Sequence, residues 1–335
     1  MRRTVARREP RRRLGWPVGA PPVGIHLGVA GGLPRAARRA RQIGATALQI
    51  FSDNPTAWRR RSGPSPNVGE FIDYCGRHGI APVAIHASYL INLAGSAEPF
   101  ASQSRTGLIH EMQRAPAYGA SLVNTHIGSH RGVGSATGMR RIVDNVVAIL
   151  AQSPPGVRLV LENSAGGGDN LGSRIEQLAA ILEDVAAAAP GAAGQLAFCL
   201  DTAHLWGAGH DISTPDGATG VIDRFEELIG LDRLPLVHLN DSRSVLGSRT
   251  DRHEHVGAGR IGSAGLGALL RDPRLAMART AFMMETPGVD EGYDAVNLRR
   301  AWLLYNGTDT LPALPPKAFR LNRSSTRRAP AGSRR

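Results

Sequence analysis

The sequence predicts an α/β protein in which eight parallel strands close into a (β/α)8 barrel, the TIM-barrel architecture. Three observations support this fold class. Eight short apolar segments recur along the chain, each ends in a polar residue, and segments with helical spacing separate them. A chain of 335 residues also has room for one barrel domain of about 250 residues.

The eight apolar segments are too short for helices and are typical of strands buried on both faces of a parallel sheet. They are GIHLG (24–28), ALQIFS (47–52), PVAIHAS (82–88), LVNTHIG (122–128), RLVLENS (158–164), LAFCLDT (196–202), PLVHLND (235–241) and AFMMETP (281–287).

The segments between these strands carry apolar residues at helical spacing, most distinctly in 33–45, 139–152 and 173–189. Pro190 and Gly191 end the last of them. The helices after the sixth and seventh strands have a less distinct pattern. Strands that alternate with helices in this way indicate βα units along the whole chain.

A doubly wound open sheet is the competing fold. It would need a glycine-rich fingerprint after the first strand, and GVAGGLP (28–34) does not match G-x-G-x-x-G. We therefore expect a single barrel domain over 23–312. Residues 1–22 and 313–335 are rich in Arg, Pro, Gly and Ser without apolar periodicity, and we expect both to be disordered.

The net charge of +12 belongs to these two ends of the chain. Residues 1–22 hold seven Arg and one Glu, and residues 316–335 hold six Arg and one Lys, so the part between them is close to neutral. A basic tail adds affinity for nucleic acid that does not depend on sequence, but we assign no nucleic-acid site to either tail.

Two features bear on the compartment. Cys75 and Cys199 lie far apart and neither belongs to a C-x-x-C pair, so we expect no disulfide framework and a reducing cytoplasm. No run of about 18 uncharged apolar residues occurs, so we expect no membrane-spanning segment.

Six potential metal ligands lie at the ends of six successive predicted strands. They are His86, His126, Glu162, Asp201, His238 and Glu285, at intervals of 40, 36, 39, 37 and 47 residues. Because the carboxyl ends of all barrel strands open onto one face, these side chains are predicted to converge on one mouth. Three imidazoles and three carboxylates suit zinc or manganese.

Each of these residues alone has an ordinary structural interpretation. A single His at a strand end is commonly a hydrogen-bonded loop residue, Glu162 suits a helix cap, and Asp201 suits a turn with Thr202. The joint register favours metal binding, because three carboxylates crowded at one mouth cost free energy unless cations accompany them.

The stretch DRHEHVGAGRIG (251–262) adds ligands after the seventh strand. Asp251 and His253 lie there, and His204 follows Asp201 by three residues. Two His and one Asp form a complete three-ligand set with room for water, so we expect a third ion. The alternative is a solvated charged turn with Glu254 and His255 as surface neighbours.

These residues carry a resemblance to the endonuclease IV family of apurinic/apyrimidinic endonucleases, over about residues 23–305. All nine positions at which that family places zinc ligands hold a suitable residue. The matching stretches are HASYLINLAG (86–95), NTHIGS (124–129), ENSAGGG (162–168), LDTAHLWGAGHD (200–211), HLNDSR (238–243), DRHEHVGAGRIG (251–262) and METP (284–287).

The resemblance implies three zinc ions, with manganese as an alternative at one site. The ligands of the first ion would be His86, His126 and Glu162. Glu162 would bridge to a second ion, whose other ligands would be Asp201, His238 and Glu285. The ligands of the third would be His204, Asp251 and His253.

The implied activity is a DNA-repair hydrolysis. The substrate would be double-stranded DNA with abasic sites, cut on the 5′ side to leave a 3′-hydroxyl and a 5′-deoxyribose phosphate, or DNA with blocked 3′ ends. Glu162 and Glu285 would be catalytic, and we assign Glu285 the additional role of orienting or deprotonating the attacking water. The resemblance also implies a monomer.

The expected DNA contacts come from two loops. Tyr89 matches a family position that contacts bent DNA, and the alternative is a packed loop tyrosine. FSDNPTAWRRR (51–61) resembles the family's DNA-recognition loop, with Asn54, Arg59 and Arg60 as expected contacts. Thr56 and Ala57 depart from the family, which commonly places long polar wedge residues there.

Two other functions fit part of the pattern. A sugar isomerase or epimerase of the xylose-isomerase-like group would share the fold and a two-metal or one-metal carboxylate/His site, but it has no need of His204, Asp251 and His253. A non-catalytic DNA-binding protein would fit the altered wedge loop, and the intact ligand set argues against it.

Overall fold

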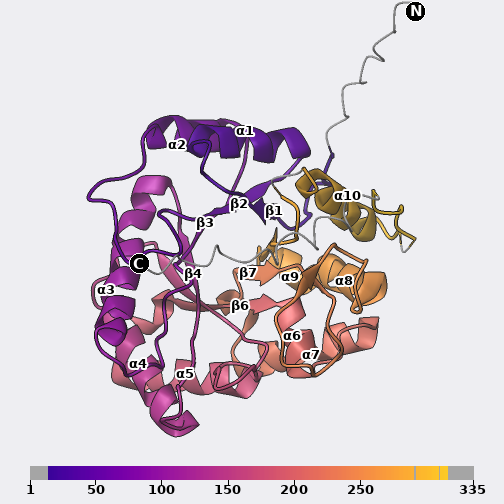
Figure 1. Ribbon diagram of the computed structural model, residues 1–335. Coiled ribbons are helices and arrows are strands. Elements are labelled where there is room, and N and C mark those ends of the chain that lie inside the picture. The colour runs from indigo at the N-terminus through magenta and orange to yellow at the C-terminus, as the bar shows by residue number, and fades with distance from the viewer. Residues whose placement is uncertain (1–13, 290–291, 309, 316–335) are drawn as a thin grey trace, which may run out of the picture.

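The computed structural model describes residues 14–289, 292–308 and 310–315. Within them, eight parallel strands close into a barrel in the order β1, β10, β7, β6, β5, β4, β3, β2. Helices surround the strands, so that the sheet is enclosed on its outer face (Figure 1). The prediction of an eight-stranded α/β barrel is confirmed.

Each predicted strand segment contains one strand of the barrel. The strands are β1 (Val23–His26), β2 (Ala47–Ile50), β3 (Val83–His86), β4 (Leu122–His126), β5 (Arg158–Glu162), β6 (Leu196–Asp201), β7 (Leu236–His238) and β10 (Ala281–Met284).

The three helical segments predicted from spacing are also confirmed, as α1, α4 and α5. The helices are α1 (Leu33–Ile43), α2 (Val68–Arg77), α3 (Phe100–Arg114), α4 (Ser135–Leu150), α5 (Ile175–Ala188), α6 (Thr202–Ala208), α7 (Pro215–Leu228), α8 (Gly262–Arg271), α9 (Pro273–Met277) and α10 (Asp294–Tyr305).

The barrel interior is filled by a compact group of buried side chains. The group consists of Ala47, Ala84, Leu122, Val160, Ala197, Cys199, Leu236, Ala281 and Met283. Residues two apart on a strand face the same side, so the next inward-facing layer contains polar residues near the strand ends. The apolar floor therefore supports a polar layer at the mouth.

Residues 14–22 differ from the expected disordered extension. The indole of Trp16 donates to Gly44 O at 3.0 Å, and the indole of Trp302 donates to Gly15 O at the same distance. Trp16 also packs edge-on against Tyr305. The rest of the expected extension, residues 1–13, and residues 316–335 of the expected tail lie outside the described residues.

A small hairpin follows β7 and was not predicted. β8 (Asp241–Ser242) pairs antiparallel with β9 (His253–Glu254). The Asp241 carboxylate accepts hydrogen bonds from the backbone amides of Ser242, Gly259, Ile261 and Gly262. These bonds fix the segment that continues into α8.

The hairpin also argues against a solvated charged turn at this place, since Glu254 and His255 are both buried. Among the helices of the described residues, none has the length and apolar character needed to cross a membrane.

Candidate metal centre

The six strand-end residues converge as the sequence predicts. Five of them, His86, His126, Glu162, Asp201 and His238, are the last residues of β3 to β7, and Glu285 follows directly after β10. Together with His204 and His253 they form three groups whose ligand atoms lie within 4.8 Å of one another.

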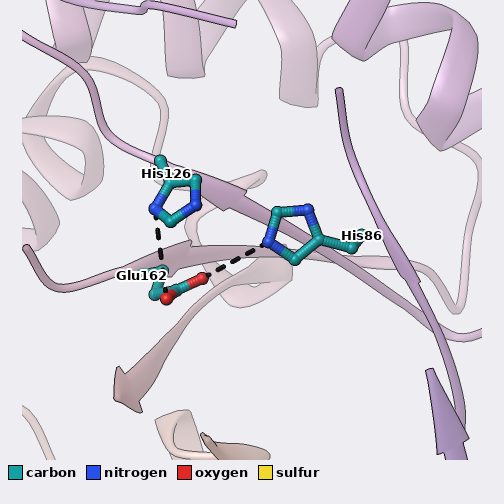
Figure 2. A group of neighbouring side chains, drawn as sticks. All are labelled: His86, His126 and Glu162. Atoms are coloured by element: carbon teal, nitrogen blue, oxygen red, sulfur yellow. Dashed lines mark ion pairs between the residues drawn. The ribbon is translucent and has the colours of Figure 1, made fainter. Parts of the chain in front are cut away.

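The first group joins β3, β4 and β5. His86 Nε2 lies 3.6 Å from Glu162 Oε2, and His126 Nδ1 lies 4.0 Å from Glu162 Oε1. Figure 2 shows both imidazoles directed toward the two oxygens of this one carboxylate. Glu162 is fully buried, whereas His126 is partly exposed, so the group is open to the mouth on one side only.

The second group is built around His238, which is fully buried at the end of β7. Its Nδ1 lies 3.4 Å from Glu162 Oε1, 3.4 Å from Glu285 Oε2 and 3.9 Å from Asp201 Oδ2. Glu162 belongs to both groups, and its Oε1 is near both His126 Nδ1 of the first group and His238 Nδ1 of the second. This arrangement fits a carboxylate that bridges two ions.

The third group lies on the outer side of Asp201. His253 Nε2 is 3.5 Å from Asp201 Oδ2 and 3.0 Å from Asp251 Oδ1, and His204 Nε2 is 3.2 Å from Asp251 Oδ2. His204 begins α6 beside the Asp201 cap, and Asp251 and His253 come from the hairpin. Asp251 is half-exposed, so this group opens to solvent.

Hydrogen bonds to the protein leave one free ring nitrogen on each of four imidazoles. The Nδ1 atoms of His86, His204 and His253 contact the carbonyl oxygens of Ala87, Asn163 and Glu285 at 2.7, 2.9 and 3.0 Å. Carbonyl oxygens only accept, so each Nδ1 carries the proton and each Nε2 is left as a ligand. His238 is reversed, because its Nε2 makes the outer contact, to Gln49 Oε1 at 3.1 Å.

Three buried ligand atoms test whether the site fits metal ions. Glu162 Oε1, His238 Nδ1 and His253 Nε2 have no hydrogen-bond partner among the described residues. A buried polar atom without a partner costs about 1–3 kcal/mol, and more when it is charged. Oxygen and imidazole nitrogen are ligands that zinc and manganese accept, so the donor set fits a divalent cation.

The imidazoles and carboxylates shift one another's pKa values. Burial lowers the pKa of His253, but the charge of Asp201 and the close contact and charge of Asp251 outweigh it and raise the pKa to about 9. The pKa of His204 is raised above 6.5 by the same carboxylates against burial. In the metal-free protein, protons on imidazoles therefore supply part of the positive charge that the carboxylates require.

The carboxylates respond in the opposite direction. Burial raises the pKa of Glu162, but the charges of His126 and His238 and the contacts of His204 hold it well below 4.5. The pKa of Glu285 is likewise held low against burial, mainly by the charge of His238. Both side chains are therefore carboxylates at neutral pH, the form that a cation needs.

An open cavity of about 710 Å³ lies over the ligands. Its floor includes His126, His204 and Glu285, and its rim includes Tyr89 and Arg243. The Tyr89 ring is exposed and packs edge-on against Phe51 at 5.2 Å, with no burial in the core. The structure therefore places this predicted DNA contact at the edge of the mouth.

The loop between β2 and α2 contains the other predicted contacts, and they lie in different environments. Asn54 is exposed, and its Oδ1 accepts from the amide and hydroxyl of Thr56 within the loop. Arg59 is exposed. Arg60 is largely buried, with its Nη1 at 3.3 Å from Glu111 Oε1 on α3. The three predictions of DNA contact stay predictions.

Several functional residues escaped the sequence analysis. Gln49 donates to Glu285 at 2.7 Å, Asn124 donates to Glu162 at 2.7 Å, and Asn240 donates to Asp201 at 2.6 Å. They stand in or beside strand segments that were interpreted by their apolar content alone. For Asn124 and Asn240, the signal that could have found them is a polar side chain two residues before or after a predicted ligand. The strand that contains Gln49 has no predicted ligand and gives no such signal.

Comparison with known proteins agrees with this geometry. The family model of the xylose isomerase-like TIM barrel matches residues 37–303. The chain is 35% identical over 281 residues to a probable endonuclease 4 of Halothermothrix orenii, which covers 83% of this chain and 99% of that protein.

Solved structures give the same result. The crystal structure of endonuclease IV from Thermus thermophilus aligns with a TM-score of 0.71 and 38% identity, and covers 84% of this chain and 99% of that one. A D-tagatose 3-epimerase-like protein aligns with a TM-score of 0.61 at 16% identity over 84% of this chain and 97% of that one, which shows a shared fold alone.

The fold and the ligand groups at its mouth thus define an enzyme built on a xylose isomerase-like TIM barrel. Sequence identity over nearly the whole length of the relatives narrows this class. The chain belongs to the endonuclease IV family.

The raised pKa of His253 predicts how metal changes the pH dependence of stability. Its contribution to the metal-free fold is complete below the unfolded value of 6.5 and is lost as pH rises through about 9. We expect the melting temperature of chelator-stripped protein to fall between pH 6.5 and 9, and that of metal-loaded protein to rise, because metal binds neutral imidazole. Differential scanning fluorimetry at three pH values measures both.

The matched variants for this experiment are His253→Asn and His210→Ala. His253→Asn removes the titrating group and should flatten the slope of melting temperature against pH in the chelator-stripped protein. The second removes a histidine that contacts Ser173 O outside the three groups and should leave the slope as it is. An unchanged slope in His253→Asn would contradict the assignment.

Proposed function

We propose that the protein is an apurinic/apyrimidinic endonuclease that hydrolyses the phosphodiester 5′ to an abasic site, leaving a 3′-hydroxyl and a 5′-deoxyribose phosphate. The observation that carries this proposal is the third ligand group. A two-metal or one-metal sugar isomerase has no need of His204, Asp251 and His253, yet here they meet beside Asp201 under one open cavity.

The proposed ligand sets follow the first two groups, and the third set takes Asp251, which contacts both imidazoles, in place of Asp201. His86, His126 and Glu162 would hold one ion, and Glu162 would also reach the ion held by Asp201, His238 and Glu285. His204, Asp251 and His253 would hold a third. We propose zinc at these positions, with manganese as the alternative at one of them, because imidazoles and carboxylates are mixed in each set.

When bound, zinc lowers the pKa of a water molecule to about 7 and offsets negative charge on a phosphodiester. The chain supplies the rest of the chemistry. Glu285 is a carboxylate that lines the cavity, its Oε1 is held by Gln49 and His26, and its Oε2 lies 3.4 Å from His238 Nδ1. Held in this way, Glu285 can orient the attacking water and accept its proton.

The shape and charge of the mouth support a DNA substrate with a missing base. An abasic nucleotide must leave the duplex to reach a recessed site, and the cavity of about 710 Å³ provides room for it. Arg243 and Arg252 on the hairpin side line the cavity and suit phosphate contacts. Tyr89, which also lines the cavity, presents an exposed ring that can stack on an unpaired base.

Removal of blocked 3′ ends is part of the same proposal, because such a terminus also presents a phosphodiester without a base beyond it. We propose that the protein acts as a monomer on chromosomal DNA in the cytoplasm. Thr56 and Ala57 are too short to act as wedges, so the distortion of the duplex would depend on Tyr89 and the arginines.

Cleavage of a defined duplex tests the proposal. A duplex with one tetrahydrofuran abasic analogue should be cut in EDTA without magnesium by wild type, because tightly held ions survive brief exposure to chelator. The analogue cannot undergo β-elimination, so a cut means hydrolysis. Loss of the third ion in His204→Ala/Asp251→Ala should lower turnover by about a hundredfold or more, roughly 3 kcal/mol of transition-state stabilisation.

His210→Ala/Asp216→Ala is the matched control, since it removes the same residue types outside the three groups. It should cut at the wild-type rate. Absence of cutting by metal-replete wild type would refute the proposal and favour a sugar substrate.

The role of Glu285 predicts a separation of turnover from binding. Glu285→Gln keeps the size of the side chain but cannot accept a proton, so turnover should fall about a thousandfold while the Kd for abasic duplex stays within about threefold. Single-turnover kinetics and fluorescence anisotropy measure the two quantities. Glu254→Gln, a buried glutamate of the hairpin, is the control. A Glu285→Gln variant with nearly wild-type turnover contradicts this role.

The neighbouring arginines Arg59 and Arg60 should behave differently. Arg59→Ala should weaken DNA binding and reduce the slope of log K against log salt by about one, because an exposed arginine can neutralise one phosphate. Arg60→Ala should instead lower the melting temperature, because it leaves the buried Glu111 unpaired at a cost of about 3–5 kcal/mol. Restored stability in Arg60→Met/Glu111→Gln would support the buried pair.

A further inference from the structure

Gln49 lies in the centre of the barrel, in the same layer as the ligands. It stands two residues after Ala47, which belongs to the apolar floor, as His86 does after Ala84 and Glu162 after Val160. Its side chain is completely buried. An amide in such a position costs free energy unless its hydrogen bonds are satisfied, so its contacts are informative.

Both ends of this amide contact a proposed metal ligand. Gln49 Nε2 donates to Glu285 Oε1 at 2.7 Å, and Gln49 Oε1 lies 3.1 Å from His238 Nε2. The two ligands come from β7 and from the end of β10, and in the barrel β1 separates β10 from β2. One side chain therefore joins two ligands of the same proposed ion.

The chemistry of the partners fixes the orientation of the amide. A carboxylate only accepts hydrogen bonds, so the NH₂ group must face Glu285. The oxygen then faces His238 and requires a proton on His238 Nε2. That proton leaves His238 Nδ1 as the free nitrogen, and this is the atom that lies 3.4 Å from Glu162 Oε1 and from Glu285 Oε2.

The same contact orients the Glu285 carboxylate. Oε1 is engaged by Gln49 and by His26 Nδ1 at 3.0 Å, so Oε2 is the oxygen directed toward His238. A leucine or methionine at position 49 would provide neither the donor nor the acceptor. Of the four imidazoles with an outer contact, His238 is the one whose tautomer depends on a side chain rather than on a backbone carbonyl.

We propose that Gln49 is a positioning residue for the ion held by Asp201, His238 and Glu285, and that it selects the Nδ1 atom of His238 and the Oε2 atom of Glu285 as ligands. This inference rests on the proposed metal site. It assigns Gln49 to one ion of the three, because the side-chain hydrogen bonds of Gln49 within the described residues go to His26, His238 and Glu285.

Ion release from the loaded protein tests the inference without any DNA. Residues that hold a ligand in place commonly contribute about 10- to 100-fold to metal affinity. In Gln49→Met, which keeps the length of the side chain, we expect one ion per chain to be released to a chromogenic chelator about 10- to 100-fold faster than in wild type. The other ions should leave at wild-type rates. Elemental analysis of the gel-filtered protein counts what remains.

Thr280→Val is the matched control, because it removes a buried side-chain hydrogen bond at the opposite end of the barrel, to Leu234 O. Gln49→Asn is the second variant and serves where Gln49→Met does not fold. It keeps the amide but is one methylene too short to reach both partners. We therefore expect the same faster release of one ion per chain. With abasic duplex, both Gln49 variants should lose turnover and keep the wild-type Kd.

A measurement on wild type alone removes the dependence on folding of the variants. Long-range ¹⁵N–¹H spectra of the zinc-loaded protein should show His238 protonated at Nε2, and His86, His204 and His253 protonated at Nδ1. A His238 ring protonated at Nδ1 would overturn the inference, as would wild-type release of every ion from both Gln49 variants.

The outcomes separate this inference from the proposed nuclease activity. A wild-type protein that holds its ions but does not cut abasic duplex overturns the proposed function and leaves the release experiment valid. A wild-type protein that cuts, with Gln49 variants that release every ion at the wild-type rate, overturns this inference alone.

Discussion

The buried charge of Glu162 is the constraint on which the rest of the site depends. Its carboxylate is completely enclosed at the end of β5, and three imidazoles, those of His126, His204 and His238, lie within 4.0 Å of its Oε1. Removing a carboxylate from water costs several kcal/mol unless positive charge accompanies it. Burial lowers the pKa of His126, but neighbouring negative charges raise the pKa values of His204 and His238 against burial, so protons on these two supply that charge in the metal-free protein, and metal ions would replace them. Binding of the ions and loss of protons are therefore one coupled equilibrium.

Barrel geometry explains why this charge could be assembled from distant parts of the chain. Alternation along β3, β5, β6, β7 and the end of β10 places an apolar floor residue two positions before a ligand on the same inward face, and on β4 Asn124 stands between Leu122 and His126. The closed barrel directs these residues at one axis. The third group depends on a different device. His204 lies in the first turn of α6, and Asp251 and His253 belong to the hairpin that follows β7, so this group comes from elements added after the strands. A barrel fold shared with sugar epimerases therefore leaves room for a different chemistry.

The same geometry decides what could be predicted from sequence. The ends of strands at regular intervals predicted six ligands, because the spacing of the apolar segments and the polar residues that end them can both be read from the sequence. The different environments of Arg59 and Arg60 could not be predicted from the sequence. Arg60 is buried because it pairs with Glu111 on α3, about fifty residues further along the chain. Gln49 was hidden for a related reason. It is a single polar residue within an apolar segment, and only the closed barrel shows that its neighbours are His238 and Glu285.

Neutral side-chain amides, and not charged groups, orient the carboxylate ligands for a physical reason. Three of the proposed carboxylate ligands accept a hydrogen bond from a side-chain amide: Glu285 from Gln49 at 2.7 Å, Glu162 from Asn124 at 2.7 Å and Asp201 from Asn240 at 2.6 Å. An arginine or lysine could orient a carboxylate equally well, but its charge would cancel the field that attracts a divalent cation and would repel the cation directly. An amide fixes the geometry and leaves the negative charge intact. This distinction separates a carboxylate held for metal binding from one held in an ordinary ion pair, such as Glu111 with Arg60.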